Sequence, residues 1–291
     1  MTPMRVMVLG ATGLMGSTLV PYLRQCGHTV VTNAAAAGAR ADLTQDDAMR
    51  TCLDSAMPDA IVNLIALTNV DECERSPQQA YLVNTKIVEN ITAWMRDTAR
   101  HVHLIHISSD QVYNASGPHR EDQVVLSNYY GFSKYAGELA AATVPHTILR
   151  TNFFGVSQCP GRTSFSDWLV RALRQDESIT VFDDVLFSPL SLGTLVSLIE
   201  QVISRSLQGV FNVGSRDGLS KADFAFTLAQ QLNLSSANMR RGSSSSSPLT
   251  AYRPKDMRLD VAKFEAAMGM PMPILQKEIY SVCKEYENAA R

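Results

Sequence analysis

The amino-acid sequence predicts an α/β protein, with a doubly wound parallel sheet followed by a smaller α/β domain. Apolar, β-branched runs alternate with amphipathic stretches through the first half, the pattern of repeated strand–helix units. The first such run ends in a glycine-rich turn that opens a helix, Gly10-Ala11-Thr12-Gly13-Leu14-Met15-Gly16. At 291 residues the chain is long enough for two modest domains, and the alternation loosens after Gly155.

The composition is that of an ordinary globular protein. A formal net charge of -2 gives no basic signature for nucleic-acid binding. No apolar run approaches ~20 residues, so no membrane span is expected. The beginning of the sequence shows no secretory signal, which predicts a cytoplasmic protein. The five cysteines lie at no metal-ligand spacing, so reduced thiols are expected.

The first strand–turn–helix unit predicts a dinucleotide site of the Rossmann-like kind. Residues Met4–Leu9 form the strand, and the helix runs to Gln25. Gly10 allows the sharp turn, Gly13 lets the backbone approach a pyrophosphate, and Gly16 lets the helix pack close to the strand. The helix N-terminus then faces the phosphates. The cofactor contacts expected here are Gly10, Thr12, Gly13, Leu14, Met15 and Gly16.

The second strand, His28–Asn33, indicates which cofactor is preferred. An NAD site usually has an acid near the end of this strand, to hold the ribose 2′-hydroxyl. Here the strand ends without one, and Arg40 is the nearest cation. The sequence therefore favours NADPH over NADH. Asp42 either caps the following helix or faces the adenine, and the cofactor candidates of this region are Asn33, Arg40, Asp42 and Leu43.

The third strand, Asp59–Leu67, reads as buried, and its end is expected near the nicotinamide ribose. The acid-rich stretch Thr68–Glu74 is predicted to be a loop, and a helix should run from Ser76-Pro77 to about Arg96. The cofactor candidates of this unit are Leu64, Ala66, Thr68 and Asn84.

The fourth strand, Val102–Ile107, lies among three histidines. His101 and His103 fall on one face of the strand and His106 on the other, so they do not converge on a metal and none is predicted. Ser108-Ser109-Asp110 follows the strand, where ligands bind in open parallel sheets. The Ser109 hydroxyl can orient a substrate carbonyl, or it can simply cap the next turn.

Tyr130 and Lys134 lie four residues apart in Asn128-Tyr129-Tyr130-Gly131-Phe132-Ser133-Lys134. On a helix they share one face. A nearby cation lowers the pKa of a phenol, so such a pair can exchange a proton with a carbonyl oxygen near neutral pH. A solvated helix face is the simpler interpretation of this spacing alone, but the glycine-rich turn and Ser109 favour a catalytic set.

The joint pattern resembles the extended short-chain dehydrogenase/reductase superfamily, and within it the dTDP-4-dehydrorhamnose reductase family. The segments that carry the closer likeness span nearly the whole chain; they are Ile107–Tyr113, Tyr130–Lys134, Arg150–Gly155 and Arg253–Asp260. The resemblance implies an NAD(P)H-dependent reductase of a 4-keto nucleotide-sugar in carbohydrate biosynthesis. It implies Tyr130 as the catalytic acid, Lys134 as its activator and ribose ligand, and Ser109 as the hydroxyl that polarises the ketone.

One departure concerns assembly. Members of the rhamnose branch often carry an acid after the glycine-rich turn, in a magnesium-linked dimer contact, whereas Ser17-Thr18 follow Gly16 here. A homodimer is still possible for this chain, but it would not use the magnesium-linked contact. Two alternative functions also stay open: an epimerase or dehydratase of the same superfamily, and a non-catalytic subunit that binds NADP. Gln111 after Asp110 argues against a 4,6-dehydratase, which usually has an acid pair there.

The second half is predicted to form the substrate domain. We expect residues 1–155 to form the dinucleotide-binding domain and 156–291 mainly the substrate-binding domain, with segments near 179–213 returning to the first. The serine run Ser243–Ser247 is expected to be flexible. Arg253 and Arg258 can bind a substrate diphosphate or form surface salt bridges. The expected substrate contacts are Thr68, Val70, Ser109, Asp110, Asn152, Phe153, Arg253 and Arg258.

Overall fold

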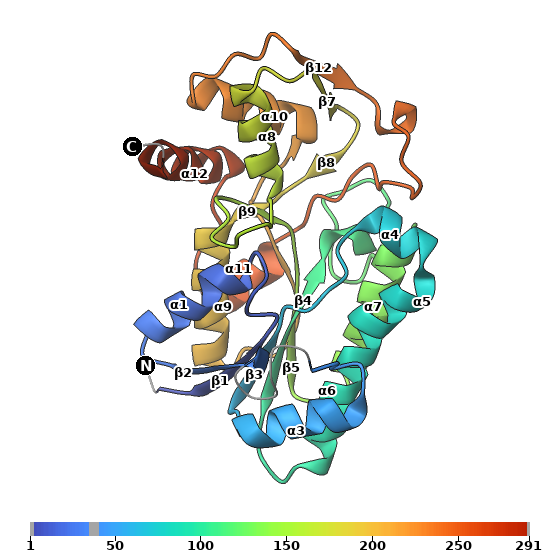
Figure 1. The fold of residues 1–291 in the computed structure, drawn as a ribbon, viewed down its shortest axis with the longest axis vertical. Helices are drawn as coiled ribbons and strands as arrows, with labels where there is room; N and C mark the ends of the chain where they lie inside the picture. The colour runs from blue at the N-terminus through green and yellow to red at the C-terminus, as the bar shows by residue number, and fades with distance from the viewer. Residues whose placement is uncertain (1–2, 35–40, 290–291) are drawn as a thin grey trace.

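The computed structural model describes residues 3–34 and 41–289, so Arg40 lies outside the described residues. The larger lobe is built on a six-stranded sheet in the order β10-β5-β4-β3-β1-β2, with all neighbouring strands parallel (Figure 1). Its strands are β1 (Arg5–Leu9), β2 (Thr29–Thr32), β3 (Ala60–Asn63), β4 (His103–Ser109), β5 (His146–Thr151) and β10 (Gly209–Val213). The predicted fold class is confirmed.

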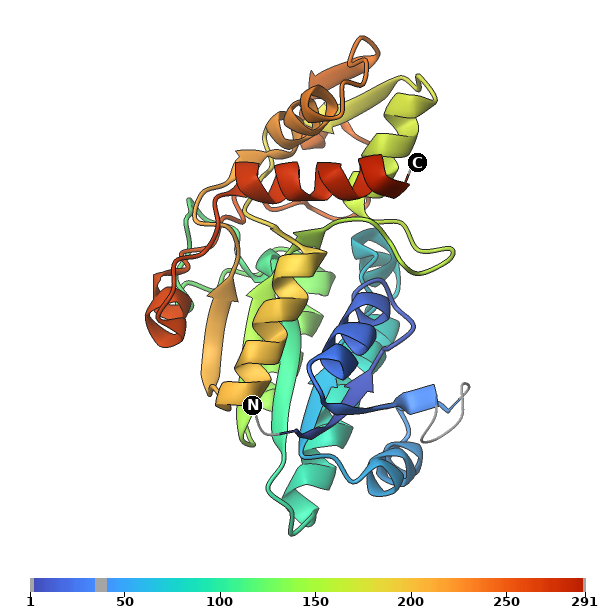
Figure 2. The same ribbon diagram turned by 90° about the vertical axis from the view of Figure 1, so that its left-hand side faces the viewer.

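Helices cover both faces of this sheet because side chains of a strand alternate between its faces. In β1, Val6 and Val8 belong to one core cluster, whereas Met7 and Leu9 belong to another, and all four are fully buried. The first cluster lies under α1 (Gly16–Gln25), α9 (Leu192–Arg205) and α11 (Ala262–Met268). The second lies under α3 (Asp46–Ala56) and α6 (Ile87–Asp97), on the side that also carries α7 (Tyr129–Ala141) (Figures 1 and 2).

The stretch after β3 differs from the prediction. The expected loop at Thr68–Glu74 is wrong: Val70–Arg75 forms helix α4, because the side chain of Asn69 caps it by accepting from the backbone N–H of Glu72. The long helix predicted next is divided into α5 (Pro77–Tyr81), a π-helical turn η1 (Leu82–Lys86) and α6. Such π turns are frequent at functional sites.

The smaller lobe contains α8 (Phe165–Arg174), α10 (Lys221–Gln231) and α12 (Leu275–Ala289). Short strand pairs link its parts: β6 (Phe153–Phe154) with β9 (Leu190–Ser191), β7 (Ile179–Phe182) with β12 (Met239–Gly242), and β8 (Leu186–Phe187) with β11 (Leu219–Ser220). Its core packs phenylalanines edge to face, with the Phe154 and Phe224 rings 4.8 Å apart and Phe187 5.5 Å from Phe224. Ser220 caps α10, since its hydroxyl accepts from the Asp223 N–H.

Two short 3₁₀ turns complete the described elements, η2 (Asp110–Val112) and η3 (Ser244–Ser246). The second lies within the serine run, and Asp184 accepts hydrogen bonds from Ser243 and Ser244. The segment after it returns to the larger lobe, where the His119 N–H donates to the Arg258 carbonyl oxygen at 2.8 Å. Within the part of the chain that the structure describes, no helix is both long and apolar enough to cross a membrane.

Candidate active site

A cavity of about 600 Å³ opens at the carboxyl ends of the sheet strands. Its volume lies in the range of ordinary ligand pockets, roughly 300–1,000 Å³. The strand order reverses between β1 and β3, and in open α/β sheets ligands bind at such a reversal. Its walls come from four places: the glycine-rich turn, the ends of β3, β4 and β5, helix α7, and the loop before α8. The predicted site residues that line it are Gly10, Thr12, Gly13, Leu14, Met15, Gly16, Leu64, Ala66, Thr68, Ser108, Ser109, Asp110, Tyr130, Lys134, Asn152 and Phe153.

The glycine-rich turn has the geometry that a dinucleotide requires. Gly10 has φ +84°, and a Cβ on Gly16 would lie 2.4 Å from the Gly10 carbonyl oxygen, so neither position accepts a side chain. A Cβ on Gly13 would meet only that same oxygen, at 3.3 Å. The space over Gly13 therefore belongs to the cavity, and a ligand can approach the backbone there. Asn33 supports the turn by accepting from the Gly10 N–H at 3.2 Å.

Ser109 lies at the end of β4, where it caps the next turn and also lines the cavity. Its Oγ caps η2 by accepting from the Gln111 N–H at 3.1 Å, and the same residue lines the cavity. The hydroxyl also donates to Asp110 Oδ1 at 3.2 Å. Asn152 Nδ2 donates to the other oxygen of Asp110 at 2.8 Å. Burial nevertheless raises the pKa of Asp110 to about 6.

Tyr130 and Lys134 are one turn apart on α7, as predicted, and are only 8% and 2% exposed. A solvated helix face is thereby excluded for this pair. The Lys134 ammonium donates to the Ile107 carbonyl oxygen at 2.7 Å, which leaves two of its three protons for other acceptors. Burial lowers the pKa of Lys134 to about 8, while the charge of Glu138 opposes the shift, so the ammonium is largely charged at neutral pH.

The prediction that the pKa of Tyr130 is lowered is wrong for the protein without bound cofactor or substrate. Burial raises that pKa above its ordinary value, a hydrogen bond with Ser109 opposes the rise, and the charge of Asp110 adds to it. The physical reason is that removal of the phenol from water penalises the phenolate. A phenol with a raised pKa keeps its proton at neutral pH, which suits a group that must donate one.

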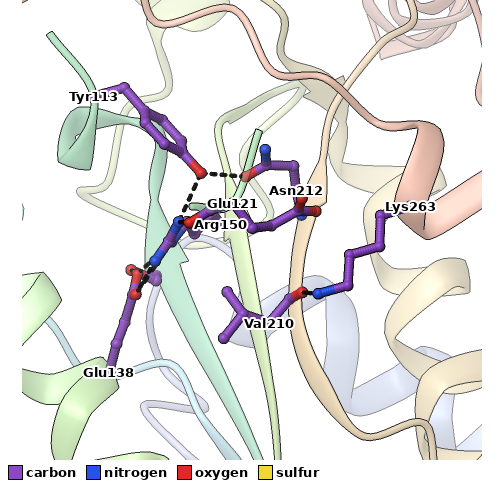
Figure 3. A network of polar contacts seen from close by, with 8 residues as sticks. Tyr113, Glu121, Glu138, Arg150, Val210, Asn212 and Lys263 are labelled. Atoms are coloured by element: carbon purple, nitrogen blue, oxygen red, sulfur yellow. Dashed lines mark hydrogen bonds and ion pairs between the residues drawn. The ribbon is translucent and has the colours of Figure 1, made fainter. Parts of the chain in front are cut away.

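A buried polar network fixes α7 against the sheet behind the cavity (Figure 3). Arg150 of β5 pairs with Glu138 of α7, with Nη2 2.6 Å from Oε2, and its Nη1 donates to the Tyr113 hydroxyl at 2.7 Å. Tyr113 in turn donates to Asn212 Oδ1 of β10 at 2.8 Å. Glu138 also accepts from the Ser108 hydroxyl. The network therefore joins the helix that carries Tyr130 and Lys134 to the strand end that carries Ser109.

Several predicted cofactor residues do not line the cavity. Asn84 is fully buried and holds the β3–α4 connection, with Leu67 N donating to its Oδ1 at 2.7 Å. Asp42 accepts from the Thr44 N–H at 3.0 Å and so supports the turn before α3, but the N-cap of that helix is Gln45, so the expected cap at Asp42 is wrong. Leu43 packs in the core under α3. Asn33 supports the glycine-rich turn through its hydrogen bond with the Gly10 N–H and does not line the cavity.

The two arginines predicted for the substrate diphosphate are paired with acids. Arg253 Nη2 lies 2.8 Å from Asp71 of α4, and Arg258 Nη2 lies 2.7 Å from Asp256. Neither arginine lines the cavity, nor does Val70, which packs beside Tyr130. The salt-bridge alternative is therefore the one that the structure shows for both arginines.

The histidines of the fourth strand have separate partners. His103 Nε2 lies 2.8 Å from Thr147 Oγ1, and His106 Nδ1 lies 3.2 Å from Asn63 Nδ2. Burial lowers the pKa of His106 well below its ordinary value, so it is neutral. Across residues 3–34 and 41–289, no group of three or more potential ligands is arranged to hold a metal ion.

The structure also brings residues to the site that sequence reasoning missed. Arg162 and Thr163, in the loop before α8, line the cavity, as does Phe165 at the start of that helix. Lys221 of α10 lies over two rings, with its Nζ 5.1 Å from the Phe165 centroid and 5.7 Å from that of Phe187. Burial lowers the pKa of Lys221, and the charge of Asp110 opposes the shift. No motif marks these residues, since they are distant in sequence from the strand ends.

Comparison with protein families gives a match over nearly the whole chain. The model described as RmlD substrate binding domain matches residues 4–288, nearly the whole chain.

Curated relatives are similar over most of their length. The probable low-salt glycan biosynthesis reductase Agl14 of Haloferax volcanii is 28% identical, over 95% of this chain and 96% of the relative. A dTDP-4-dehydrorhamnose reductase of Mycolicibacterium smegmatis is 29% identical, over 86% and 76%. The spore coat polysaccharide biosynthesis protein SpsK of Bacillus subtilis is 29% identical, over 80% and 81%.

Solved structures share the fold. A dTDP-4-dehydrorhamnose reductase from Bacillus anthracis, in complex with NADP, aligns with a TM-score of 0.88 at 24% identity, over 98% of this chain and 100% of the other. A hypothetical dTDP-4-dehydrorhamnose reductase from Sulfolobus tokodaii aligns with a TM-score of 0.83 at 25% identity, over 94% and 97%.

Proposed function

Since this chain belongs to the RmlD substrate binding domain family, we propose that it is an NAD(P)H-dependent reductase of a 4-keto nucleotide-sugar in carbohydrate biosynthesis. One observation carries the proposal: Ser109, Tyr130 and Lys134 line the same cavity as the glycine-rich turn. A proton donor, a carbonyl-orienting hydroxyl and a dinucleotide cradle therefore open onto one space. Relatives named as reductases, over nearly the full length of this chain, support it.

Each polar residue of the cavity has a separate role in the proposed reaction. A reduced nicotinamide, when bound, supplies the hydride to the keto carbon. Tyr130 gives its proton to the developing alkoxide, and its raised pKa ensures that the proton is present at neutral pH. Ser109 hydrogen-bonds to the same oxygen and orients it. Lys134 stabilises the phenolate that remains, because its ammonium is charged and lies one turn away on α7.

The cofactor assignment follows from the shape of the turn. The open space over Gly13 and the start of α1 at Gly16 suit a pyrophosphate, which the free N–H groups of a helix N-terminus bind well. NADPH is favoured over NADH because β2 ends without an acid. The substrate contacts that the cavity supports are Thr68, Ser109, Asp110, Asn152 and Phe153.

One observation favours an epimerase as the second candidate. Asp110 is a buried carboxyl group beside Ser109, and a pKa of about 6 suits proton exchange near neutral pH. Epimerisation next to a ketone needs a base and an acid on opposite faces of the sugar. Asp110 is the one carboxylate among the described residues that line the cavity, which favours the reductase.

The test is a panel of 4-keto nucleotide-sugars incubated with the protein and NADPH or NADH. A reductase consumes the cofactor in proportion to the alcohol formed, which absorbance and product analysis follow together. An epimerase instead returns a changed sugar with no net consumption. A non-catalytic subunit binds the cofactor in a titration and turns over no member of the panel, which would refute the proposed activity.

A further inference from the structure

The loop that joins β6 to α8 connects the smaller lobe with the glycine-rich turn of the larger lobe (Figure 2). Cys159 Sγ donates to the Thr12 carbonyl oxygen at 3.0 Å, which ties the loop to the turn. The Arg162 N–H donates to the Cys159 carbonyl oxygen at 3.2 Å, so the loop folds back directly after this contact. Asp167 fixes both flanks by accepting from the N–H groups of Ser157 and Ser164, at 3.2 and 2.9 Å. The position of Arg162 is thus set by both lobes.

Arg162 is a cation at the cavity, and the described residues give it no acidic partner. Arg162 lines the cavity together with Gly10, Thr12 and Gly13, and the residue is exposed. Among residues 3–34 and 41–289, which the structure describes, no carboxylate oxygen lies within 4.0 Å of the Arg162 guanidinium nitrogens.

Three basic residues of the segment after the serine run, by contrast, have acidic partners. Arg253 pairs with Asp71, Lys255 with Asp184, and Arg258 with Asp256. Arg162 is therefore available to a bound anion, whereas these three residues are engaged.

A dinucleotide bound at the glycine-rich turn would bring an anion to this side of the cavity. Its pyrophosphate carries two negative charges, while the glycine-rich turn offers only uncharged N–H groups and the dipole of α1. A guanidinium group binds phosphate oxygens through paired hydrogen bonds and keeps its charge at every physiological pH. Among the described cavity-lining residues, Lys134 is the other cation, and it lies on α7, by the catalytic groups.

We propose that Arg162 is a further cofactor-binding residue, which contacts the pyrophosphate of the dinucleotide from the smaller lobe. The inference rests on the proposed use of a nicotinamide dinucleotide but not on the identity of the sugar. Arg162 could in principle bind either the pyrophosphate or a 2′-phosphate of the cofactor. The contact between Cys159 and Thr12 favours the pyrophosphate. It places the loop over the middle of the turn, where the pyrophosphate lies, and not at the end of β2, where a 2′-phosphate would lie.

The experiment measures dissociation constants of NADPH and NADH, by titration, for the wild-type protein and two variants. Arg162→Met removes the charge and keeps most of the side-chain length, while Arg162→Lys keeps the charge without the paired hydrogen bonds. A hydrogen bond to a charged group contributes about 1.5–3 kcal/mol, so Arg162→Met should weaken both cofactors by roughly 10- to 100-fold. Arg162→Lys should fall between the two. The control is Arg171→Met, which removes an exposed arginine of α8 that does not line the cavity and should leave both constants unchanged.

Each result supports or overturns the assignment. Equal weakening of NADPH and NADH supports a pyrophosphate contact, because both cofactors share that group. Weakening of NADPH alone would assign Arg162 to the 2′-phosphate and overturn the inference. Unchanged constants in Arg162→Met, an equal loss in Arg171→Met, or a wild-type protein that binds neither cofactor would also overturn it. A wild-type protein that binds cofactor but reduces no 4-keto nucleotide-sugar would refute the proposed reaction and leave this inference intact.

Discussion

Arg150 Nη2 lies 2.6 Å from Glu138 Oε2, in an ion pair whose two side chains are only 4% and 3% exposed (Figure 3). The pair joins β5 to α7, the helix that carries Tyr130 and Lys134. Because the two charges compensate each other away from water, the position of the catalytic helix depends on both being present.

Removal of one partner should therefore destabilise the protein strongly. We expect Glu138→Ala to lower the free energy of unfolding by about 3–5 kcal/mol, because it leaves Arg150 charged and buried. Removal of both partners, in Glu138→Ala with Arg150→Met, should cost less than the sum of the single losses. Urea unfolding measures all three. The matched control is Asp97→Ala, which breaks the exposed pair with Arg50 and should cost less than about 1 kcal/mol. Additive losses in the buried pair would contradict this account.

Tyr130→Phe should remove the phenolic proton and leave the ring and the cofactor site in place. Positioned acids contribute roughly 100- to 10,000-fold to rate, so kcat should fall by that range. The cofactor dissociation constant should change little, since the phosphates bind at the glycine-rich turn. Steady-state kinetics and cofactor titration measure the two effects, and full activity of the variant would end the proposed mechanism.

Lys134→Met should affect both rate and cofactor binding. The change removes a charge beside Tyr130 and a hydrogen-bond donor that can reach the ribose. The double variant with Tyr130→Phe should be less impaired than the product of the single effects predicts, because both residues serve one proton transfer. A multiplicative loss of kcat would indicate separate roles for the two side chains.

Asp110 should make the stability of the protein depend on pH. Its pKa rises from an ordinary 3.8 to about 6 in the folded protein, so the folded state holds this proton more tightly than the unfolded state. The resulting stability is full below about pH 4 and is lost as the pH rises through about 6. Asp110→Asn should lack this loss. The stability difference between variant and wild type should therefore move in favour of the variant, by about 1–3 kcal/mol from pH 4 to pH 7. Denaturant titrations across that range decide it, and a constant difference would contradict the raised pKa.

Cofactor preference gives a further test of the site. We expect NADPH to be used at least as well as NADH, because no acid stands at the end of β2 to bind a free 2′-hydroxyl. The measurement is kcat/KM for both cofactors at one fixed concentration of the sugar substrate. A strong preference for NADH would show that another group holds the ribose.

The sequence by itself determined the parallel sheet, the glycine-rich turn and the position of Ser109, Tyr130 and Lys134. These features depend on local rules: the alternation of buried side chains in strands, the backbone freedom of glycine, and the spacing of one helical turn. The same rules missed α4, because the cap at Asn69 outweighed the loop-like composition around it. For Arg253 and Arg258 these local rules could not distinguish between binding a substrate diphosphate and forming a salt bridge.

Only the tertiary structure decided which charges find partners. Arg253 is paired because Asp71, 182 residues away in sequence, folds against it, whereas Arg162 lines the cavity because the loop before α8 is tied to Thr12. The raised pKa of Tyr130 likewise depends on how completely the two lobes exclude water from it. Burial and ion pairing are properties of the assembled three-dimensional neighbourhood, so no spacing of residues along the chain could predict them.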